Sequence, residues 1–260
     1  MPVTIVSVMT PYDLDVRAWQ ESWDRQQEAF MPDREHRFAA MLDAVEAVTG
    51  DRPPRVLDLA GGTGSISLRT LARRPDAEVT VLDLDPVLLT LAEAALAGRA
   101  TVVTADLNRS DWAATLPHRD YDAVLTATAL HWVDGPRLAQ LYGEIRDVLR
   151  PGGVFVNADH MPDDTMPSLA ARLGDLAKAR RAARHRAGAA PSWPEWWEQA
   201  AGDPVLGPLV EKRRQIYPTG HSPEWSPPAA WHLDALRAAG FTEAGVLWRG
   251  GADAAVAGLR

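Results

Sequence analysis

A short apolar segment that runs directly into three glycines, VLDLAGGTGS, constrains the fold of this chain more than any other feature. Its apolar and β-branched start predicts a strand. Residues 65–74 then predict a helix, because Leu68 and Leu71 are apolar at helical spacing. Glycines between a strand and a helix let the backbone approach a ligand closely and leave helix N–H groups directed at it. The segment therefore predicts a strand–loop–helix unit whose loop binds a ligand.

The same alternation of strand and helix continues through the middle of the chain. Further strands are predicted at 78–83, 101–106, 121–126 and 154–158, and further helices at 86–96 and 136–149. Near-continuous apolar strands separated by helices indicate a parallel sheet covered on both faces. After a helix at 229–239, two apolar segments joined by Gly250-Gly251 predict a hairpin, with the last strand antiparallel at or near the sheet edge. The expected fold class is α/β: a Rossmann-like doubly wound sheet, mostly parallel with a C-terminal antiparallel hairpin strand, plus helical N-terminal and inserted lid elements.

Two segments fall outside this alternating core. Residues 10–50 have a helical apolar pattern, and residues 161–228 form an insertion whose length is typical of a lid or a binding element. Its arginine-rich stretch, ARRAARHR, is expected to be a solvated helix face, because the chain around it is acidic. The expected organisation has four parts: a helical N-terminal lid segment (1–50), a cofactor-binding core (51–160), an inserted substrate or lid region (161–228), and a final helix and hairpin that complete the core (229–260).

The composition excludes several classes of protein. The chain of 260 residues is 46% hydrophobic and 24% charged, close to the globular average, which argues against disorder. It has no cysteine, which excludes disulfides and thiolate sites, and its net charge of −8 argues against nucleic-acid binding. No apolar run is long enough to span a membrane, and the N-terminus lacks the basic start and cleavage site of a signal peptide. We therefore expect a cytoplasmic protein that binds neither nucleic acid nor membrane.

The acidic residue that ends the second strand bears on which ligand the glycine loop binds. Asp83 is placed to accept hydrogen bonds from a ribose. As a dinucleotide fingerprint, however, the loop lacks its third glycine, and no Tyr-x-x-x-Lys pair accompanies either lysine. Taken alone, the loop and Asp83 suit NAD and S-adenosylmethionine about equally.

The remaining motifs separate these two ligands. Along the chain they read VLDLAGGTG, VLDLDP, VVTADL, YDAVLTATALHW and LRPGGVFV, followed by the closing hairpin. In this order they resemble the class I S-adenosylmethionine-dependent methyltransferase family over residues 55–160 and 229–260, and the TALHW stretch resembles small-molecule methyltransferases of the trans-aconitate type. Ala60 stands where the family often has its first glycine, which we expect to be a mild departure because alanine costs little unless its φ is positive. The resemblance implies S-adenosylmethionine as the cofactor.

The resemblance also implies roles for individual residues. The amino-acid end of the cofactor would contact Ala60, Gly61, Gly62 and Gly64, and its ammonium would contact Asp58. The ribose hydroxyls would contact Asp83, with Leu84 beside it. The adenine would contact Asp106 and Leu107, and the methionine end would contact Thr126 and Ala127. Any single aspartate at a strand end can simply cap a turn. Three of them at the expected strand ends favour a ligand site.

Two histidines are candidates for the chemistry of methyl transfer. The reaction needs alignment of nucleophile, methyl and sulfur, and a base only when the nucleophile carries a proton of high pKa. His131 follows the fourth strand, and His160 follows the fifth with Asp159 beside it, so both stand at the carboxyl edge of the sheet. We expect His160 to point toward the pocket, whereas the family residue at the position of His131 usually lines it. An Asp–His pair also suits a metal, but no third ligand stands at a telling spacing, so no metal site is expected.

Aromatic and histidine side chains outside the core are candidates for substrate contacts. They are Trp19, Trp23, His221 and Trp225. Tryptophans 193, 196 and 197 either form an aromatic wall for substrate or anchor the insertion onto the core. His232, inside the last helix, is expected to be structural.

The sequence thus predicts a methyltransferase that acts on an O, N or activated C nucleophile of a small molecule, in specialised metabolism. One alternative is an enzyme of the same fold that catalyses elimination, cyclisation or decarboxylation with the same histidines. Another is a non-catalytic partner subunit whose tryptophan-rich insertion binds a protein. The expected partner is a small-molecule substrate, with an oligomer or a partner subunit left open.

Overall fold

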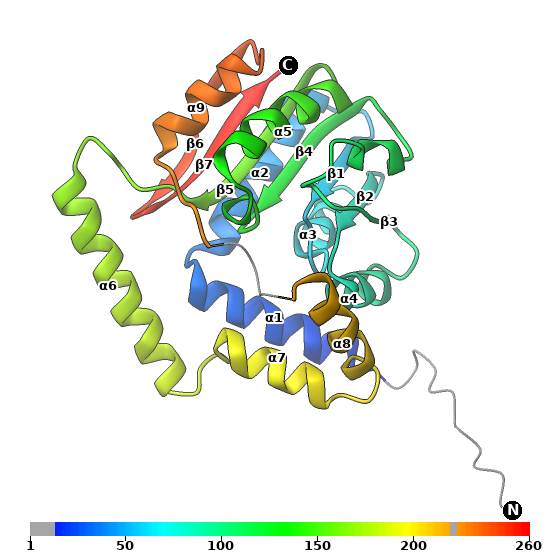
Figure 1. Ribbon diagram of the computed structural model, residues 1–260. Helices are drawn as coiled ribbons and strands as arrows, with labels where there is room; N and C mark the ends of the chain where they lie inside the picture. The colour runs from blue at the N-terminus through cyan, green and yellow to red at the C-terminus, as the bar shows by residue number, and fades with distance from the viewer. Residues whose placement is uncertain (1–13, 219–222) are drawn as a thin grey trace, which may run out of the picture.

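In the computed structural model, which describes residues 14–218 and 223–260, a seven-stranded sheet has the strand order β3-β2-β1-β4-β5-β7-β6 (Figure 1). Strands β1 to β5 pair in parallel, and β7 is antiparallel to both of its neighbours. The strands are β1 (Arg55–Leu59), β2 (Glu78–Asp83), β3 (Thr101–Thr104), β4 (Tyr121–Ala127), β5 (Leu149–His160), β6 (Glu243–Gly250) and β7 (Asp253–Leu259). The predicted fold class is confirmed, and the last strand lies one position in from the edge.

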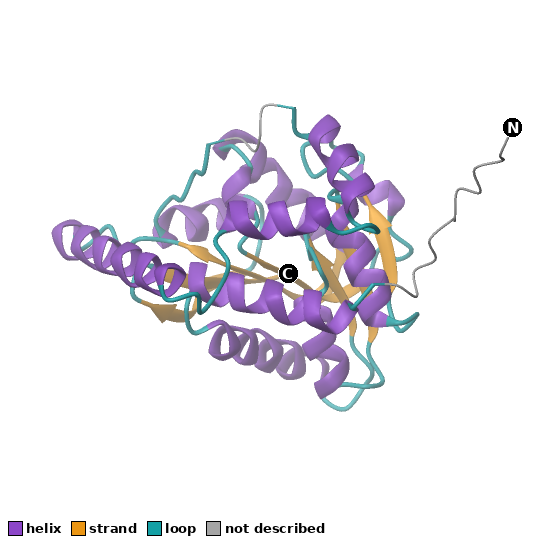
Figure 2. Ribbon diagram, turned by 90° about the horizontal axis from the view of Figure 1, so that it is seen from below, coloured by secondary structure: helices purple, strands orange, loops and turns teal. Residues whose placement is uncertain are grey.

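Helices cover both faces of the sheet, because successive apolar strand residues point to opposite sides. Val56 packs with Phe38, Met41 and other residues of α2, and α3 and α4 lie on that same face, whereas Leu57 packs with residues of α5 and α9 on the other. Figure 2 shows the helices around the sheet. The helices are α1 (Val16–Phe30), α2 (Arg34–Thr49), α3 (Ser65–Arg73), α4 (Pro86–Leu96), α5 (Gly135–Val148), α6 (Pro167–Arg186), α7 (Trp193–Gly202), α8 (Gly207–Ile216) and α9 (Ala229–Ala238), with 3₁₀ turns at Trp112–Thr115 and Leu130–Trp132.

Helices α1, α7 and α8 lie together beside the carboxyl ends of the parallel strands (Figure 1). Their contact is a tryptophan cluster: the Trp196 ring is fully buried and lies 5.0 Å from that of Trp23 and 5.3 Å from that of Trp19, centroid to centroid. Leu88 and Leu91 of α4 belong to the same buried cluster. Trp196 therefore anchors the insertion onto the core.

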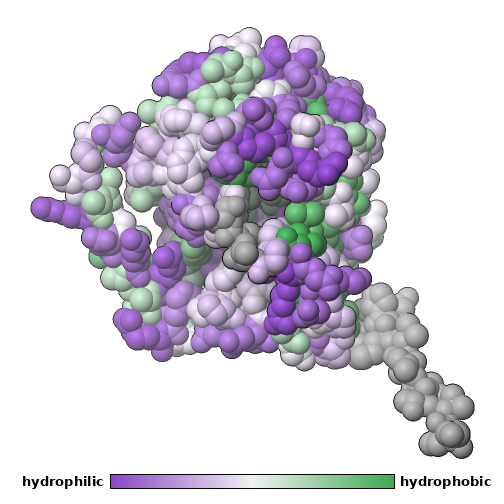
Figure 3. All heavy atoms as spheres, viewed as in Figure 1, coloured by the Kyte–Doolittle hydropathy of each residue, from purple (hydrophilic) through white to green (hydrophobic). Residues whose placement is uncertain are grey.

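Helix α6 differs from the other helices because it projects from the body (Figures 1 and 2) and has no buried residue. Its arginine-rich end touches α1 through Arg181, whose guanidinium lies 5.0 Å from the Phe30 ring centroid. Figure 3 shows hydrophilic and apolar residues mixed along this helix, with Leu169 and Leu176 among the exposed ones, and a hollow between it and the rest of the molecule. The predicted solvated helix face is confirmed.

Two strand boundaries differ from the predicted ones. β3 ends at Thr104 because Asp106, predicted to be its last residue, instead accepts a hydrogen bond from the Asn108 N–H and turns the chain. β5 begins at Leu149, earlier than predicted, because Leu149 pairs with Tyr121 before a bulge that contains the predicted Pro-Gly-Gly turn. The first difference arises from a local turn and the second from pairing with another strand, and apolar periodicity predicts neither.

The loop after β1 corrects one expectation. Ala60 has a φ of +51°, in the left-handed region that favours glycine, so its departure from the family pattern is not mild. Gly62 and Gly64 follow with φ values of +57° and +76°. The loop therefore needs three left-handed residues within five positions, and at the first of them the chain carries a side chain.

Within the described part of the chain, no helix is long and apolar enough to cross a membrane.

Replacing Ala60 by glycine is expected to raise the free energy of unfolding by about 1 kcal/mol, as measured by urea denaturation. The left-handed conformation costs alanine about 1–2 kcal/mol, and glycine removes this cost. The greater freedom of glycine in the unfolded chain offsets part of the resulting stabilisation. Ala97, the C-cap of α4 with a φ of +50°, should respond in the same direction.

Ala94→Gly, inside α4, is the matched control and should lower the free energy of unfolding by about 1 kcal/mol. An Ala60→Gly protein no more stable than the wild type would contradict the strain assigned to this loop.

Candidate functional site

A cavity of about 520 Å³ lies at the carboxyl ends of the parallel strands. On the sheet side it is lined by the loop after β1 and by the residues that end β2 and β4 and follow β3. On the opposite side it is lined by α1 and by the inserted α7 and α8. Among the residues predicted to bind cofactor, the lining includes Asp58, Ala60, Gly61, Gly62, Asp83, Leu84, Asp106, Leu107 and Ala127.

Asp58, near the end of β1, is fully buried and only half satisfied. Its Oδ2 accepts hydrogen bonds from the Ser67 backbone N–H (3.0 Å) and hydroxyl (2.7 Å), both in α3. Its Oδ1 has no hydrogen-bond partner, and burial raises the pKa of this carboxyl to about 6. A buried carboxylate oxygen without a donor needs a cation or a donor from outside the chain.

Asp83 ends β2 beside Asp58 and is held by backbone. Its Oδ2 accepts from the Gly62 N–H (2.8 Å), and its Oδ1 accepts from the N–H groups of Leu84 (2.7 Å) and Asp85 (2.9 Å). Burial raises its pKa, although these three donors act in the opposite direction. The carboxylate is thus fixed in position against the loop, and its remaining acceptor capacity faces the cavity that it lines.

The other predicted cofactor contacts divide into two groups. Asp106 and Leu107 line the cavity after β3, and Ala127 lines it at the end of β4. Gly64 and Thr126 do not line it. A side chain at Gly64 would meet Leu96 of α4, so this glycine allows close helix packing, and Thr126 is fully buried within the sheet.

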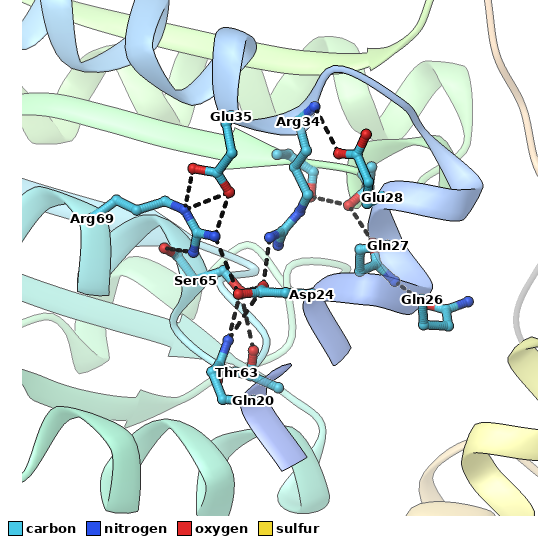
Figure 4. A network of polar contacts seen from close by, with 12 residues as sticks. Gln20, Asp24, Gln26, Gln27, Glu28, Arg34, Glu35, Thr63, Ser65 and Arg69 are labelled. Carbon is cyan, nitrogen blue, oxygen red and sulfur yellow. Dashed lines mark hydrogen bonds and ion pairs between the residues drawn. The ribbon is translucent and has the colours of Figure 1, made fainter. Parts of the chain in front are cut away.

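A polar network joins α1 and α2 to the start of α3 (Figure 4). Asp24 of α1 accepts hydrogen bonds from Arg34 (2.5 Å), Arg69 (3.1 Å) and the Ser65 hydroxyl (2.9 Å). Burial raises the pKa of Asp24, but the two arginines more than offset this and hold it below its usual value. Glu35 of α2 pairs with Arg69 as well. The network fastens the N-terminal helices to the glycine loop.

Arg34 is a cavity residue that the sequence did not point to. Its side chain is buried, belongs to the cavity lining together with Asp58, and stacks over Phe38 with its guanidinium 4.5 Å from the ring centroid. Burial lowers its pKa, opposed chiefly by Asp24. No spacing rule relates a residue at the start of α2 to the glycine loop, so only the fold brings them together.

His131 lies in the cavity wall and is tightly paired. Its Nδ1 lies 2.7 Å from Asp159 Oδ1, and its backbone N–H donates to Asp159 Oδ2 (3.2 Å). Burial lowers the pKa of His131, but Asp159 and then Glu224 more than offset it, so the pKa is raised. Since Asp159 accepts from Nδ1–H, the acceptor nitrogen of the neutral ring is Nε2.

His160 does not line the cavity, contrary to the expectation that it would point there. Its Nδ1 pairs with Asp253 of β7 at 2.6 Å, and its ring packs on Phe30 at 4.9 Å between centroids. Asp159, its neighbour in sequence, directs its side chain to His131 instead, because successive strand residues point to opposite faces.

Only some of the residues predicted to contact substrate line the cavity. Trp23 lines the cavity. Trp19 donates its indole N–H to Asp203 (3.2 Å), Trp225 packs on Trp231 with centroids 4.7 Å apart, and neither lines the cavity. His221 lies outside the described residues. Of the inserted tryptophans, 193 and 197 line the cavity, whereas 196 is fully buried and anchors α7.

His232 is structural, as expected. It is buried, its Nδ1 lies 2.6 Å from the Tyr142 hydroxyl, and burial lowers its pKa to about 4. Among the residues that the structure describes, no group of three or more His, Asp or Glu side chains is placed to hold a metal ion.

Comparison with known proteins gives consistent matches. Residues 56–153 match the family described as methyltransferase domain. The chain is similar to trans-aconitate 2-methyltransferase of Methylobacterium radiotolerans, with 30% identity over 205 residues, which cover 79% of this chain and 68% of that protein. It is also similar to the ubiquinone/menaquinone biosynthesis C-methyltransferase of Methylobacterium nodulans, with 38% identity over 110 residues, 40% of this chain and 41% of that protein. The match thus spans less than half the length of the second relative.

Among solved structures, human N-acetylserotonin methyltransferase in complex with S-adenosylmethionine is similar to this chain with a TM-score of 0.57 at 15% identity. The similarity covers 97% of this chain and 60% of the human one, and it shows the shared fold.

In an NMR titration of the histidine-labelled protein, the His131 ring is expected to titrate above 6.5, the ordinary histidine value. Asp159→Asn should lower that pKa, because it removes the main interaction that favours the protonated ring. The pair stabilises the fold at pH values below 6.5, and this contribution is lost as the pH rises through the folded-state pKa.

His131→Gln assigns the resonance, and Asp163→Asn, an exposed carboxylate bonded to Thr165, should leave the titration unchanged. A wild-type His131 that titrates below 6.5 would show that burial outweighs Asp159.

Proposed function

This chain belongs to the class I S-adenosylmethionine-dependent methyltransferases, and we propose that it methylates an O, N or activated C nucleophile of a small molecule in specialised metabolism. One observation carries the proposal: Asp58 and Asp83, two carboxylates at the ends of neighbouring strands, line one cavity, and an oxygen of Asp58 is buried without a partner. We also place the protein in the cytoplasm, which its cysteine-free composition supports.

The polar groups of the cavity fit S-adenosylmethionine, which supplies an electrophilic methyl group when bound. Asp58 Oδ1 is available for the ammonium, a pairing that would satisfy the buried oxygen. Arg34, close enough to Asp58 to affect its pKa, is placed for the carboxylate of the same amino-acid end. Asp83 would accept from the ribose hydroxyls, and Asp106 would accept from the adenine amino group.

In this proposal the four parts of the chain either bind the cofactor or close the cavity. The core of 51–160, completed by 229–260, holds the cofactor. The N-terminal segment 1–50 and the insertion 161–228 close the cavity, which is supported by the cavity-lining residues of α1, α7 and α8.

The acceptor region follows from the aromatic residues around His131. Phe30 and Trp132 line the cavity with ring centroids 6.4 and 4.8 Å from that of His131, and Trp193 lines it from α7. Glu224 is the carboxylate that acts on His131 from the cavity wall. Of the two arginines on the described wall, Arg34 pairs with Asp24 and is assigned to the amino-acid end of the cofactor, and Arg213 pairs with Asp85. This lining supports a flat acceptor without carboxylates, in contrast to a polycarboxylate such as trans-aconitate.

His131 is the proposed general base for acceptors that must lose a proton. Asp159 orients the ring by accepting from Nδ1–H, so that Nε2 can take the acceptor proton, and it stabilises the imidazolium that results. His160, paired with Asp253 outside the cavity lining, is assigned a supporting role beside Phe30 rather than contact with the acceptor.

Asp83→Asn is expected to weaken binding of S-adenosylhomocysteine about 10- to 100-fold in calorimetric titration. It replaces a charged acceptor of the ribose hydroxyls, and hydrogen bonds to charged groups contribute about 1.5–3 kcal/mol. Asp76→Asn, an exposed carboxylate paired with Arg74 in the turn before β2, is the matched control and should bind like the wild type. Equal affinity in the Asp83 variant and the control would remove Asp83 from the cofactor site.

A mass-spectrometric screen tests the reaction itself. Small phenols and amines would be incubated with S-adenosylmethionine beside polycarboxylates of matched size. We expect a mass gain of one methylene on the uncharged aromatic acceptors, and a rate about 10²- to 10⁴-fold lower in His131→Gln for hydroxyl acceptors. Methylation confined to polycarboxylates would overturn the acceptor class, and a product with any other mass change would overturn methyl transfer.

A further inference from the structure

The inserted helix α8 covers the cofactor end of the cavity rather than the acceptor end alone. Arg213, Ile216 and Tyr217 line the same cavity as Asp83 and Asp106. Tyr217 lines the cavity together with Asp83 and Asp85, and its pKa is raised, first by burial and then by these two carboxylates. A segment expected to face substrate therefore faces the proposed ribose position as well.

An ion pair joins α8 to the turn that carries Asp83. Arg213 Nε lies 2.5 Å from Asp85 Oδ2, and the two side chains are only 14% and 5% exposed. The other oxygen of Asp85 caps α4, accepting from the N–H groups of Val87 and Leu88. Asp85 thus ties three elements together: β2, α4 and α8.

Aromatic contacts extend this pair across the insertion. The Arg213 guanidinium lies 3.9 Å from the Trp197 ring centroid and 5.0 Å from that of Tyr217. Behind it, Leu206 and Val210 pack in the buried cluster that includes Leu88. A largely buried cation that contacts aromatic rings and pairs with a carboxylate holds its helix in a defined place.

The opposite side of the cavity has a separate polar network, in which Asp24 of α1 accepts hydrogen bonds from Ser65 and Arg69 of α3. The start of α8 is also joined to α1, because Trp19 donates to Asp203, which accepts from the Leu206 N–H as well. The Arg213–Asp85 pair lies at the other end of α8 and fixes that end to the turn after β2.

We propose that α8 is part of the cofactor site: the Arg213–Asp85 ion pair holds it over the ribose–adenine end of bound cofactor, and cofactor exchange is limited by the opening of this pair. The inference rests on the proposed function, because it requires S-adenosylmethionine or its product in this cavity. Arg213 is a positioning residue, and its effect falls on the rate at which the cofactor leaves.

Stopped-flow fluorescence with S-adenosylhomocysteine tests the pair without any acceptor, since Trp23, Trp193 and Trp197 line the cavity and report on its occupancy. Arg213→Gln should accelerate dissociation at least tenfold while association changes less. Arg214→Gln is the matched control, because the neighbouring Arg214 is exposed and pairs only with Glu211 among the ion pairs of the described chain. It should leave both rates unchanged.

Asp85→Asn makes the test independent of any general loss of structure. Asparagine caps helices as well as aspartate does, so α4 keeps its N-cap while the ion pair between Arg213 and Asp85 is lost. This variant should accelerate dissociation as Arg213→Gln does, and the double variant should show no further increase.

The possible outcomes distinguish a failure of the ion-pair proposal from a failure of the proposed function. Wild-type rates in Arg213→Gln, or fully additive effects in the double variant, overturn the role of the ion pair while leaving cofactor binding intact. A wild-type protein that does not bind S-adenosylhomocysteine overturns the proposed function and this inference with it.

Discussion

Two neighbouring carboxylates, the buried Asp58 and the half-buried Asp83, are the constraint around which this molecule is arranged. Parallel pairing of β1 with β2 places Asp58 opposite Val81, so Asp83 follows at the same edge, and each residue lies against the glycine loop. Burial raises the pKa of Asp58 to about 6, and the negative charge of Asp83 acts in the same direction. Keeping Asp58 ionised at neutral pH therefore costs the fold about 3 kcal/mol, a cost that grows as the pH rises from about 4 to about 6. A cationic ligand that pairs with Asp58 offsets this cost, which is a physical reason for a positively charged cofactor at this edge.

The positions of the surrounding helices depend on these carboxylates. A buried charge is tolerated only if hydrogen-bond donors or an opposite charge replace the lost water, and the loop after β1 supplies donors through Gly62 and the start of α3. α1 and α8 then close the cavity from two sides, with Asp24 of α1 paired to Arg34 and Arg69, and Arg213 of α8 paired to Asp85. The left-handed Ala60 indicates that the loop geometry is kept despite its cost in backbone strain.

The sequence predicted the elements that periodicity and turn residues specify, and it failed where distant side chains meet. The alternation of strands and helices, the glycine loop and Asp83 were all readable, because each depends on neighbours within a few positions. Arg34 and Arg213 were not, since each reaches the cavity from a helix whose position is set by tertiary packing. His160 was expected to point toward the pocket because it follows a buried strand and opens the insertion, yet it pairs with Asp253, and Asp159 pairs with His131. The φ of Ala60 was equally hidden, because an alanine in sequence does not state its conformation.

The most direct test of this account is a crystal structure of the protein grown with S-adenosylhomocysteine. The account predicts electron density for the ligand in the cavity, with its amino group within hydrogen-bond distance of Asp58 Oδ1 and its ribose hydroxyls on Asp83. Ligand density elsewhere, or in the cavity with Asp58 Oδ1 still without a partner, would contradict it.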